Sequence, residues 1–186
     1  MRISYNAPVV LTFTFVAFTV YIVTHTMLPG LQPMFVTYPQ FSFSNPVDYF
    51  RLFSHILGHQ NLEHFMGNFT LILLLGPILE EKYGSQHLLF LILAAAFITS
   101  ILNTILFNTG LLGASGIVFL FILLASFTTF KTGEIPLTFL LVFVIFVGQE
   151  VLGVLRQDNI SQFAHILGGI LGSFFGFQFN KATNKV

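Results

Sequence analysis

The sequence predicts an all-α, polytopic membrane protein with six transmembrane helices and a helical first loop at the membrane interface. Hydrophobic residues make up 55% of the 186-residue chain, and the sequence has 25 Phe but only seven Lys/Arg and seven Asp/Glu. Six apolar stretches are also long enough to cross about 30 Å of hydrocarbon. A single soluble core cannot bury this much apolar surface, which favours a chain embedded in a bilayer.

The six predicted spans are separated by turn residues and charges. They cover Val9–Leu28, Leu62–Glu80, Gln86–Phe107, Ser115–Phe130, Ile135–Leu155 and Ser161–Phe179. The first stretch is too long for the apolar region of a signal peptide and has no small-residue cleavage site before Pro29, so we expect it to be retained. No repeat or low-complexity linker interrupts the chain, which predicts one domain over residues 1–186.

A helix is also predicted in the long connection between the first two spans. Asn45 and Pro46 have the residue types of an N-cap and a first helical position, and Gly58 is a plausible C-cap. Aromatic and aliphatic residues recur between them at helical spacing, as in Phe50 and Leu57. This pattern is typical of a helix that lies in the headgroup layer.

Six spans place both termini on the same side of the membrane, and the basic residues indicate which side. Five lie at span ends on the terminal side, and two lie on the opposite side. The five are Arg2, Lys82, Lys131, Lys181 and Lys185, against Arg51 and Arg156. By the positive-inside rule the termini are cytoplasmic.

Polar residues inside the spans fall at one common depth. Ser115 precedes Lys131 by 16 residues and His165 precedes Lys181 by 16 residues, which is about 24 Å of helix in each case. His64 and Asn68 on the second span bracket the same height. Polar side chains are costly in lipid and mark functional sites, so this agreement predicts one shared site. The uncharged segment before Ser115 would then dip into the bundle.

Small residues allow the helices that carry Ser115 and His165 to touch. Gly168 and Gly172 lie on the same helical face as His165, and Gly113, Ala114 and Gly116 keep the fourth span slim around the serine. Such ridges of small residues permit close approach of helix backbones in membranes. We therefore expect the imidazole of His165 to reach the hydroxyl of Ser115.

This arrangement predicts serine hydrolysis by a Ser115–His165 dyad. His64 and Asn68 are four residues apart and share a helical face, so both can direct donors at a developing oxyanion. Backbone N–H groups at the helix start, around Gly113 and Ala114, can add further donors. Asp158 precedes His165 by seven residues and is too far along a helix to complete a triad.

The motifs together resemble the rhomboid family of intramembrane serine proteases in its minimal six-helix bacterial form. The resemblance covers most of the chain and rests on Arg51, His55, His59, His64-x-x-x-Asn68, Glu80, Gly84-Ser85, Gly113-x-Ser115-Gly116 and Ala164-His165-x-x-Gly168-x-x-x-Gly172. It implies that Ser115 is the nucleophile, that His165 is the general base, and that His64 and Asn68 support the oxyanion. Phe119 stands where such proteins often have Tyr, so it can stack on the imidazole but has no hydroxyl.

The resemblance also implies the setting of the reaction. We expect the substrates to be transmembrane segments of other proteins, cut near the outer face, and the location to be a bacterial inner membrane. Arg51, Phe119, Gly168 and Gly172 are expected to support the site. Substrate entry past the fifth span is plausible, where Phe139, Phe143 and Phe146 form a ridge.

Three other interpretations of these residues are alternatives to the protease hypothesis. A small transporter or channel could use Glu150, but no repeat and no acid in the central span segments favours it. A non-catalytic transmembrane-helix binder would keep the glycine ridge without needing Ser115. A zinc site built from His55, His59 and His64 is disfavoured because Gly58 separates them and no His-Glu-x-x-His motif occurs. We expect His55 and His59 to join a hydrogen-bond network in the loop instead. We expect no metal or other cofactor, and the zero net charge gives no basic patch for nucleic acid.

Overall fold

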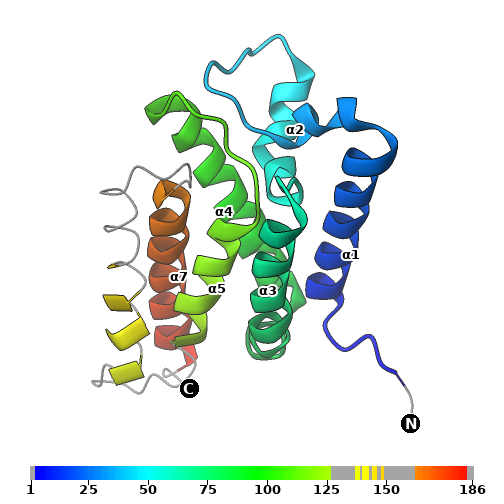
Figure 1. The fold of residues 1–186 in the computed structure, drawn as a ribbon. Helices are drawn as coiled ribbons and strands as arrows, with labels where there is room; N and C mark the ends of the chain where they lie inside the picture. The colour runs from blue at the N-terminus through cyan, green and yellow to red at the C-terminus, as the bar shows by residue number, and fades with distance from the viewer. Residues whose placement is uncertain are drawn as a thin grey trace.

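The fold is a bundle of helices that stand roughly side by side (Figure 1). The computed structural model describes residues 3–126, 137–138, 140–142, 144–145, 148 and 162–183. Within these residues the structure has helices and loops but no β-strand, and one isolated antiparallel bridge joins Thr37 to Leu111. The all-α prediction is therefore confirmed for the part of the chain that is described.

The first span is one continuous helical segment made of two parts. The α-helix α1 covers Pro8–Ile22 and passes directly into a π-helical turn, η1, at Val23–Met27. The helix starts at a proline, as is common for a first helical position, and the side chain of its N-cap residue makes no capping bond. Glu80 supplies the missing cap, because its carboxylate accepts the N–H groups of Val9 and Val10, both at 3.0 Å. The second span thereby fixes the start of the first.

The first loop contains three short helical pieces, η2 at Pro29–Phe35, α2 at Pro46–Ser54 and η3 at His55–Leu57. The Asn45 side chain caps α2 by accepting the N–H of Val47 at 3.1 Å. At the end of η3, Gly58 is required by closeness rather than by its backbone angles, since a Cβ there would lie 2.5 Å from the carbonyl oxygen of Phe35. The sequence predicted α2 and its cap, whereas η2 was not predicted.

Two long helices follow the first loop and run in opposite directions. Helix α3 covers Leu62–Tyr83 and helix α4 covers Ser85–Leu106. Gly84 joins them with φ +81°, a left-handed conformation that side chains rarely adopt. Such a tight junction leaves the two helices as neighbours in the bundle.

Among the residues that the structure describes, three helical segments are long and apolar enough to cross a membrane: Pro8–Met27, Leu62–Tyr83 and Ser85–Leu106. The later helices α5, at Ser115–Ser126, and α7, at Gln162–Thr183, have shorter apolar stretches of Ser115–Ser126 and Phe163–Gly176. The predicted fifth span, Ile135–Leu155, lies largely outside the described residues, as do Lys131, Arg156 and Asp158. A polytopic membrane protein is supported, and the count of six spans stays a prediction.

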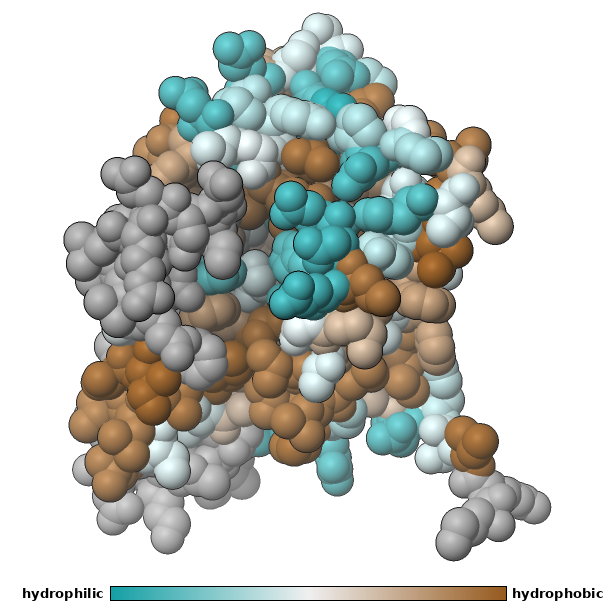
Figure 2. Space-filling view, in the orientation of Figure 1, coloured by the Kyte–Doolittle hydropathy of each residue, from teal (hydrophilic) through white to brown (hydrophobic). Residues whose placement is uncertain are grey.

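Helix α5 forms the centre of the bundle. Its residues Leu120, Phe121 and Leu124 are fully buried, and it packs against α3, α4 and α7. Helix α1 joins the bundle through α3, where the rings of Phe13 and Phe69 lie 5.2 Å apart. The start of α1 and the end of α7 lie at the same end of the molecule (Figure 1). Figure 2 shows a hydrophobic band around the lower half of this face, with hydrophilic surface above it.

Candidate active site

Ser115 is the first residue of α5, and the loop before it carries it into the bundle. In Figure 1 the chain descends from the upper end of α4 before α5 begins. The loop is tied by backbone hydrogen bonds: Thr37 and Leu111 exchange two bonds of 2.9 Å, and the N–H of Gly113 donates to the His55 carbonyl oxygen at 2.9 Å. Gly113 has φ +115°, so this turn favours glycine. The serine is thus fixed at a helix N-terminus below the end of the bundle where α4 ends (Figure 1).

Close backbone contact brings α7 and its histidine to this helix. A Cβ on Gly168 would collide with the carbonyl oxygen of Gly116, and a Cβ on Gly172 would lie 2.5 Å from the carbonyl oxygen of Leu120. The His165 ring lies one turn before Gly168 and stacks on Phe119, with the ring centroids 4.4 Å apart and the planes at 8°. Glycine at these positions therefore sets the distance from which His165 faces the start of α5.

Helix α3 contributes His64 and Asn68 from its first two turns. The helix starts at a capping residue, Asn61, whose side chain accepts the N–H of His64 at 2.8 Å. We call residues 107–114, which connect α4 to Ser115, the serine loop. The His64 ring lies directly against this loop, because a Cβ on Gly113 would fall 2.6 Å from the His64 Cε1 atom and 3.8 Å from Asn68 Nδ2. The loop conformation and the positions of both donors therefore depend on glycine at 113.

His59 connects the first loop, α3 and the serine loop. Its Nδ1 lies 3.2 Å from the Leu57 carbonyl oxygen, which can only accept, so Nδ1 carries the proton. Its Nε2 then accepts from Asn68 Nδ2 at 3.1 Å and from the N–H of Ala114 at 3.4 Å. One N–H of the Asn68 amide is thereby used, and the second is left for the pocket.

Burial keeps the two histidines of the first loop neutral. Desolvation lowers the pKa of His55 to about 4, against the hydrogen bond to the Arg51 carbonyl oxygen that raises it. Desolvation, followed by the proximity of His64, lowers the pKa of His59 to about 4. At neutral pH His59 is therefore an acceptor at Nε2, which its contacts with Asn68 and Ala114 require.

A pocket of about 490 Å³ collects the predicted residues from three helices and two loops. It is lined by Gln60, Asn61, Glu63, His64, Gly67, Asn68, Leu71, Gly110, Leu111, Leu112, Ser115, Val118, Phe119 and His165. In Figure 2 hydrophilic surface gathers near the upper end of α3, where this pocket lies. The nucleophile candidate, the base candidate and both donor candidates thus border one space that opens to the surface.

Some residues singled out in the sequence lie elsewhere or act differently. Arg51 is in the first loop, where its Nε donates to the Pro33 carbonyl oxygen at 2.9 Å and its guanidinium pairs with Asp48 at 2.6 Å. The N–H groups of Gly113 and Ala114 donate to the His55 carbonyl oxygen and His59 Nε2, so here they hold the loop. Phe139, Phe143, Phe146 and Glu150 lie outside the described residues.

The zinc alternative concerns His55, His59 and His64. Among the described residues no three His, Asp or Glu side chains are grouped as metal ligands. His55, His59 and His64, considered as a zinc set, are engaged separately: His55 bonds the Arg51 carbonyl oxygen and His59 bonds Asn68. The donor set instead suits a reaction in which negative charge develops on an oxygen atom.

Sequence reasoning missed the part played by Thr37 and underestimated that of His59. Thr37 is buried, and besides its bridge to Leu111 its hydroxyl lies 3.0 Å from Ser100 Oγ and donates to the Arg51 carbonyl oxygen at 3.2 Å. Nothing in the local sequence marks it, because a single bridge leaves no alternating pattern. His59 was predicted to join a loop network, but its bond to Asn68 depends on tertiary packing.

The fold and site define a class: a helical membrane protein with a serine at a buried helix start, a histidine on an adjacent helix and two polar donors around one pocket. The family model for the rhomboid domain matches residues 46–182, which include α2 and the whole pocket. The chain is also similar to the rhomboid protease GlpG of Haemophilus influenzae, with 25% identity over 130 residues that cover 68% of each chain. The chain belongs to the rhomboid family and is a serine protease of the GlpG type.

Proposed function

We propose that this protein is an intramembrane endopeptidase that cuts transmembrane segments of other membrane proteins near the outer face, with Ser115 and His165 as a catalytic dyad. The observation that carries the proposal is the shared pocket, which is lined both by a serine at a helix start and by the histidine of a glycine-packed neighbouring helix. The single domain over residues 1–186, six spans, cytoplasmic termini and an inner-membrane location belong to the same proposal. The start of α1 and the end of α7 lie at the same end of the bundle, which supports termini on one side of the membrane (Figure 1).

Each step of the reaction has a group to perform it. His165 takes the Ser115 proton as the oxygen attacks the scissile carbonyl, and then gives it to the leaving amine. The oxyanion is stabilised by His64 and by the free N–H of Asn68, with the Ser115 N–H at the helix start as a further donor. Water then attacks the acyl-enzyme with His165 again as base, which releases the acid and restores the serine.

The immediate test is cleavage of a model transmembrane substrate by the purified protein in liposomes. Ser115→Ala and His165→Ala are each expected to abolish cleavage, because each removes a reacting group, while the unfolding midpoint stays close to that of the wild type. Ser126→Ala is the matched control, since Ser126 lies on the same helix and its hydroxyl donates to the Ile122 carbonyl oxygen within that helix at 2.9 Å. A fluorophosphonate should label Ser115 and require His165.

The outcomes separate the competing functions. Normal cleavage by Ser115→Ala would overturn the dyad. Binding of the transmembrane segment without cleavage or labelling in the wild type would instead favour a non-catalytic helix binder. Loss of activity with a chelator, restored by Zn²⁺, would favour the metal reading.

A further inference from the structure

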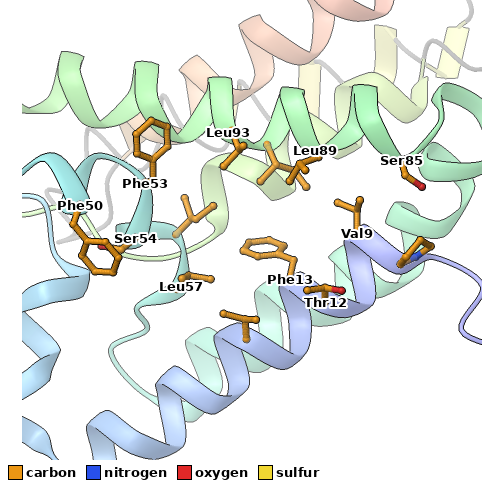
Figure 3. Close-up of a pocket in the computed structure, with 14 residues that line it drawn as sticks. Val9, Thr12, Phe13, Phe50, Phe53, Ser54, Leu57, Ser85, Leu89 and Leu93 are labelled. Carbon is orange, nitrogen blue, oxygen red and sulfur yellow. The ribbon is translucent and has the colours of Figure 1, made fainter.

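A second pocket lies between α1, α4 and the first loop, away from Ser115. Its volume is about 530 Å³. The lining residues are Pro8, Val9, Thr12, Phe13, Val16, Phe50, Phe53, Ser54, Ile56, Leu57, Ser85, Leu89, Ile92 and Leu93. Figure 3 shows Val9 and Ser85 at one end of it and Phe50 and Phe53 at the other. We call this space the α1/α4 groove.

Contacts at both ends of the groove fix how far apart α1 and α4 lie along it. Near the start of both helices, Glu80 accepts the N–H groups of Val9 and Val10 and the hydroxyl of Ser85, the last at 2.7 Å. Toward the other end the η3 turn contacts both helices, and its Ile56 is buried in the core. The two helices therefore cannot close over the space between these contacts.

The groove offers water few hydrogen-bond partners. Three hydroxyl residues line it, and each already has a partner: Thr12 Oγ1 lies 3.0 Å from the Tyr5 hydroxyl, Ser54 donates to the Met34 carbonyl oxygen at 2.7 Å, and Ser85 donates to Glu80. The other lining side chains are apolar. A buried water needs about two to four polar partners, which these walls do not provide.

The groove opens on the apolar outer surface of α1 and α4. Its lining residues Val16, Leu89 and Leu93 are exposed, and α1 and α4 are both long, apolar membrane segments. Apolar cavities of about 150 Å³ can stay empty in proteins, but a larger space forfeits many dispersion contacts unless apolar matter fills it. The bilayer around the protein supplies this apolar material in the form of lipid hydrocarbon chains.

We infer that the α1/α4 groove is a lipid-binding site that holds one phospholipid acyl chain from the leaflet at the level where α1 begins. The chain lies along Phe13, Leu89 and Leu93, and η3 stops it from extending further. The headgroup remains at the Val9–Ser85 end, near the membrane surface. This lipid is distinct from freely exchanging lipids because three elements of the protein enclose its chain.

Native mass spectrometry of the unmodified protein, purified in a mild detergent with added phospholipid, tests the inference. The wild type is expected to retain one phospholipid per chain. Leu89→Phe with Leu93→Phe fills the groove and should lose it, whereas Leu74→Phe, on the exposed face of α3, should keep it. Circular dichroism checks that all variants keep their helices. A wild type without retained lipid, or a filled variant that still retains it, would overturn the site.

A fluorescence measurement tests lipid binding directly, in a protein whose groove is left open. The chain has no Trp, so Phe53→Trp, which lines the groove, and Phe15→Trp, on the exposed side of α1, each introduce a single tryptophan in place of another aromatic residue. Titration with acyl-brominated phospholipid in detergent should quench Phe53→Trp saturably at a few equivalents, and Phe15→Trp in proportion to the lipid fraction. Parallel quenching of the two variants, or none at Phe53→Trp, would contradict the inference.

Discussion

At the scale of single residues, the neutral form of His59 is needed to hold Asn68. Its Nε2 accepts from Asn68 Nδ2 and from the Ala114 N–H, and protonation there would replace an acceptor with a donor. Because burial lowers the pKa of His59 and of His55 to about 4, from 6.5, the folded protein resists proton uptake that the unfolded chain accepts. The fit of the oxyanion donors is therefore linked to pH.

The stability of the protein should consequently fall as the pH falls. Between about pH 6.5 and about pH 4 the unfolded state binds more protons than the folded state, so the free energy of unfolding rises with pH across this window. His59→Gln keeps an acceptor oxygen but cannot titrate, and should make this pH dependence shallower. Denaturant unfolding in detergent micelles, followed by circular dichroism at several pH values, measures it. An unchanged slope in His59→Gln would exclude His59 as a source.

The sequence could predict which polar residues gather at the candidate site because such residues are rare in membrane helices. Ser115, His165, His64 and Asn68 stand out among apolar neighbours and lie at one depth, and the structure places all four around one pocket. Their supports could not be predicted in the same way. Thr37 and Ser100 are ordinary polar residues whose pairing, at 3.0 Å, joins positions far apart in the chain.

At the scale of elements, the contact between α5 and α7 requires glycine at position 168 but not at position 169. A Cβ on Gly168 would collide with the Gly116 carbonyl oxygen, whereas a Cβ on Gly169 would lie 3.8 Å from the nearest atom, Leu123 Cγ. Periodicity predicted the small-residue face that includes Gly168, because glycines spaced by four residues indicate close helix packing.

Gly168→Ala should therefore separate the helices and Gly169→Ala should not. We expect Gly168→Ala to destabilise the protein by about 1 to 3 kcal/mol, as overpacking does, and to lower kcat at least tenfold by moving His165 away from Ser115. Gly169→Ala is the matched control, with stability and kcat close to the wild type. Thermal unfolding and cleavage rates of the purified variants measure both effects, and equal behaviour of the two variants would contradict the contact.

The serine loop depends on a second element, the strap formed by Thr37 in the first loop. Thr37 exchanges two backbone bonds with Leu111, and its hydroxyl connects the loop to Ser100 on α4 and to the Arg51 carbonyl oxygen. No helical or strand period predicts this strap, since it is one bridge between two irregular segments. Helix boundaries, in contrast, followed local signals such as Asn45 and Gly84.

Thr37→Val keeps the shape and the backbone bridge but removes the hydroxyl. Leaving its buried partners unsatisfied costs about 1 to 3 kcal/mol. We expect kcat to fall about tenfold with little change in KM, because the strap orients the nucleophile rather than the substrate. Thr37→Ser should restore the rate. Thr24→Val is the control, because Thr24 is equally buried and bonds its own helix at 2.8 Å. Steady-state kinetics measure kcat and KM separately, and a change in KM alone would exclude the positioning role of Thr37.

At the scale of the whole molecule, the position of Ser115 determines what a substrate must do. The start of α5 lies below the upper end of α4 within the bundle (Figure 1), and under the proposed function a transmembrane substrate must bring a peptide bond to this position. An intact transmembrane helix keeps its carbonyl groups in bonds to the N–H four residues later. The serine can reach a carbonyl carbon only after the segment has locally unwound.

Substrates with helix-breaking residues near the cut should therefore be preferred. In helix interiors Gly is about 1 kcal/mol and Pro about 3 kcal/mol less favourable than Ala, so replacing them with Leu raises the cost of unwinding. We expect such replacements to slow cleavage about fivefold for one Gly and more for Pro. Leu replacements at the far end of the same segment serve as the control, because that part stays helical. Mass spectrometry of the products gives the cut position and the rate, and equal rates for both sets of replacements would show that unwinding does not limit the reaction.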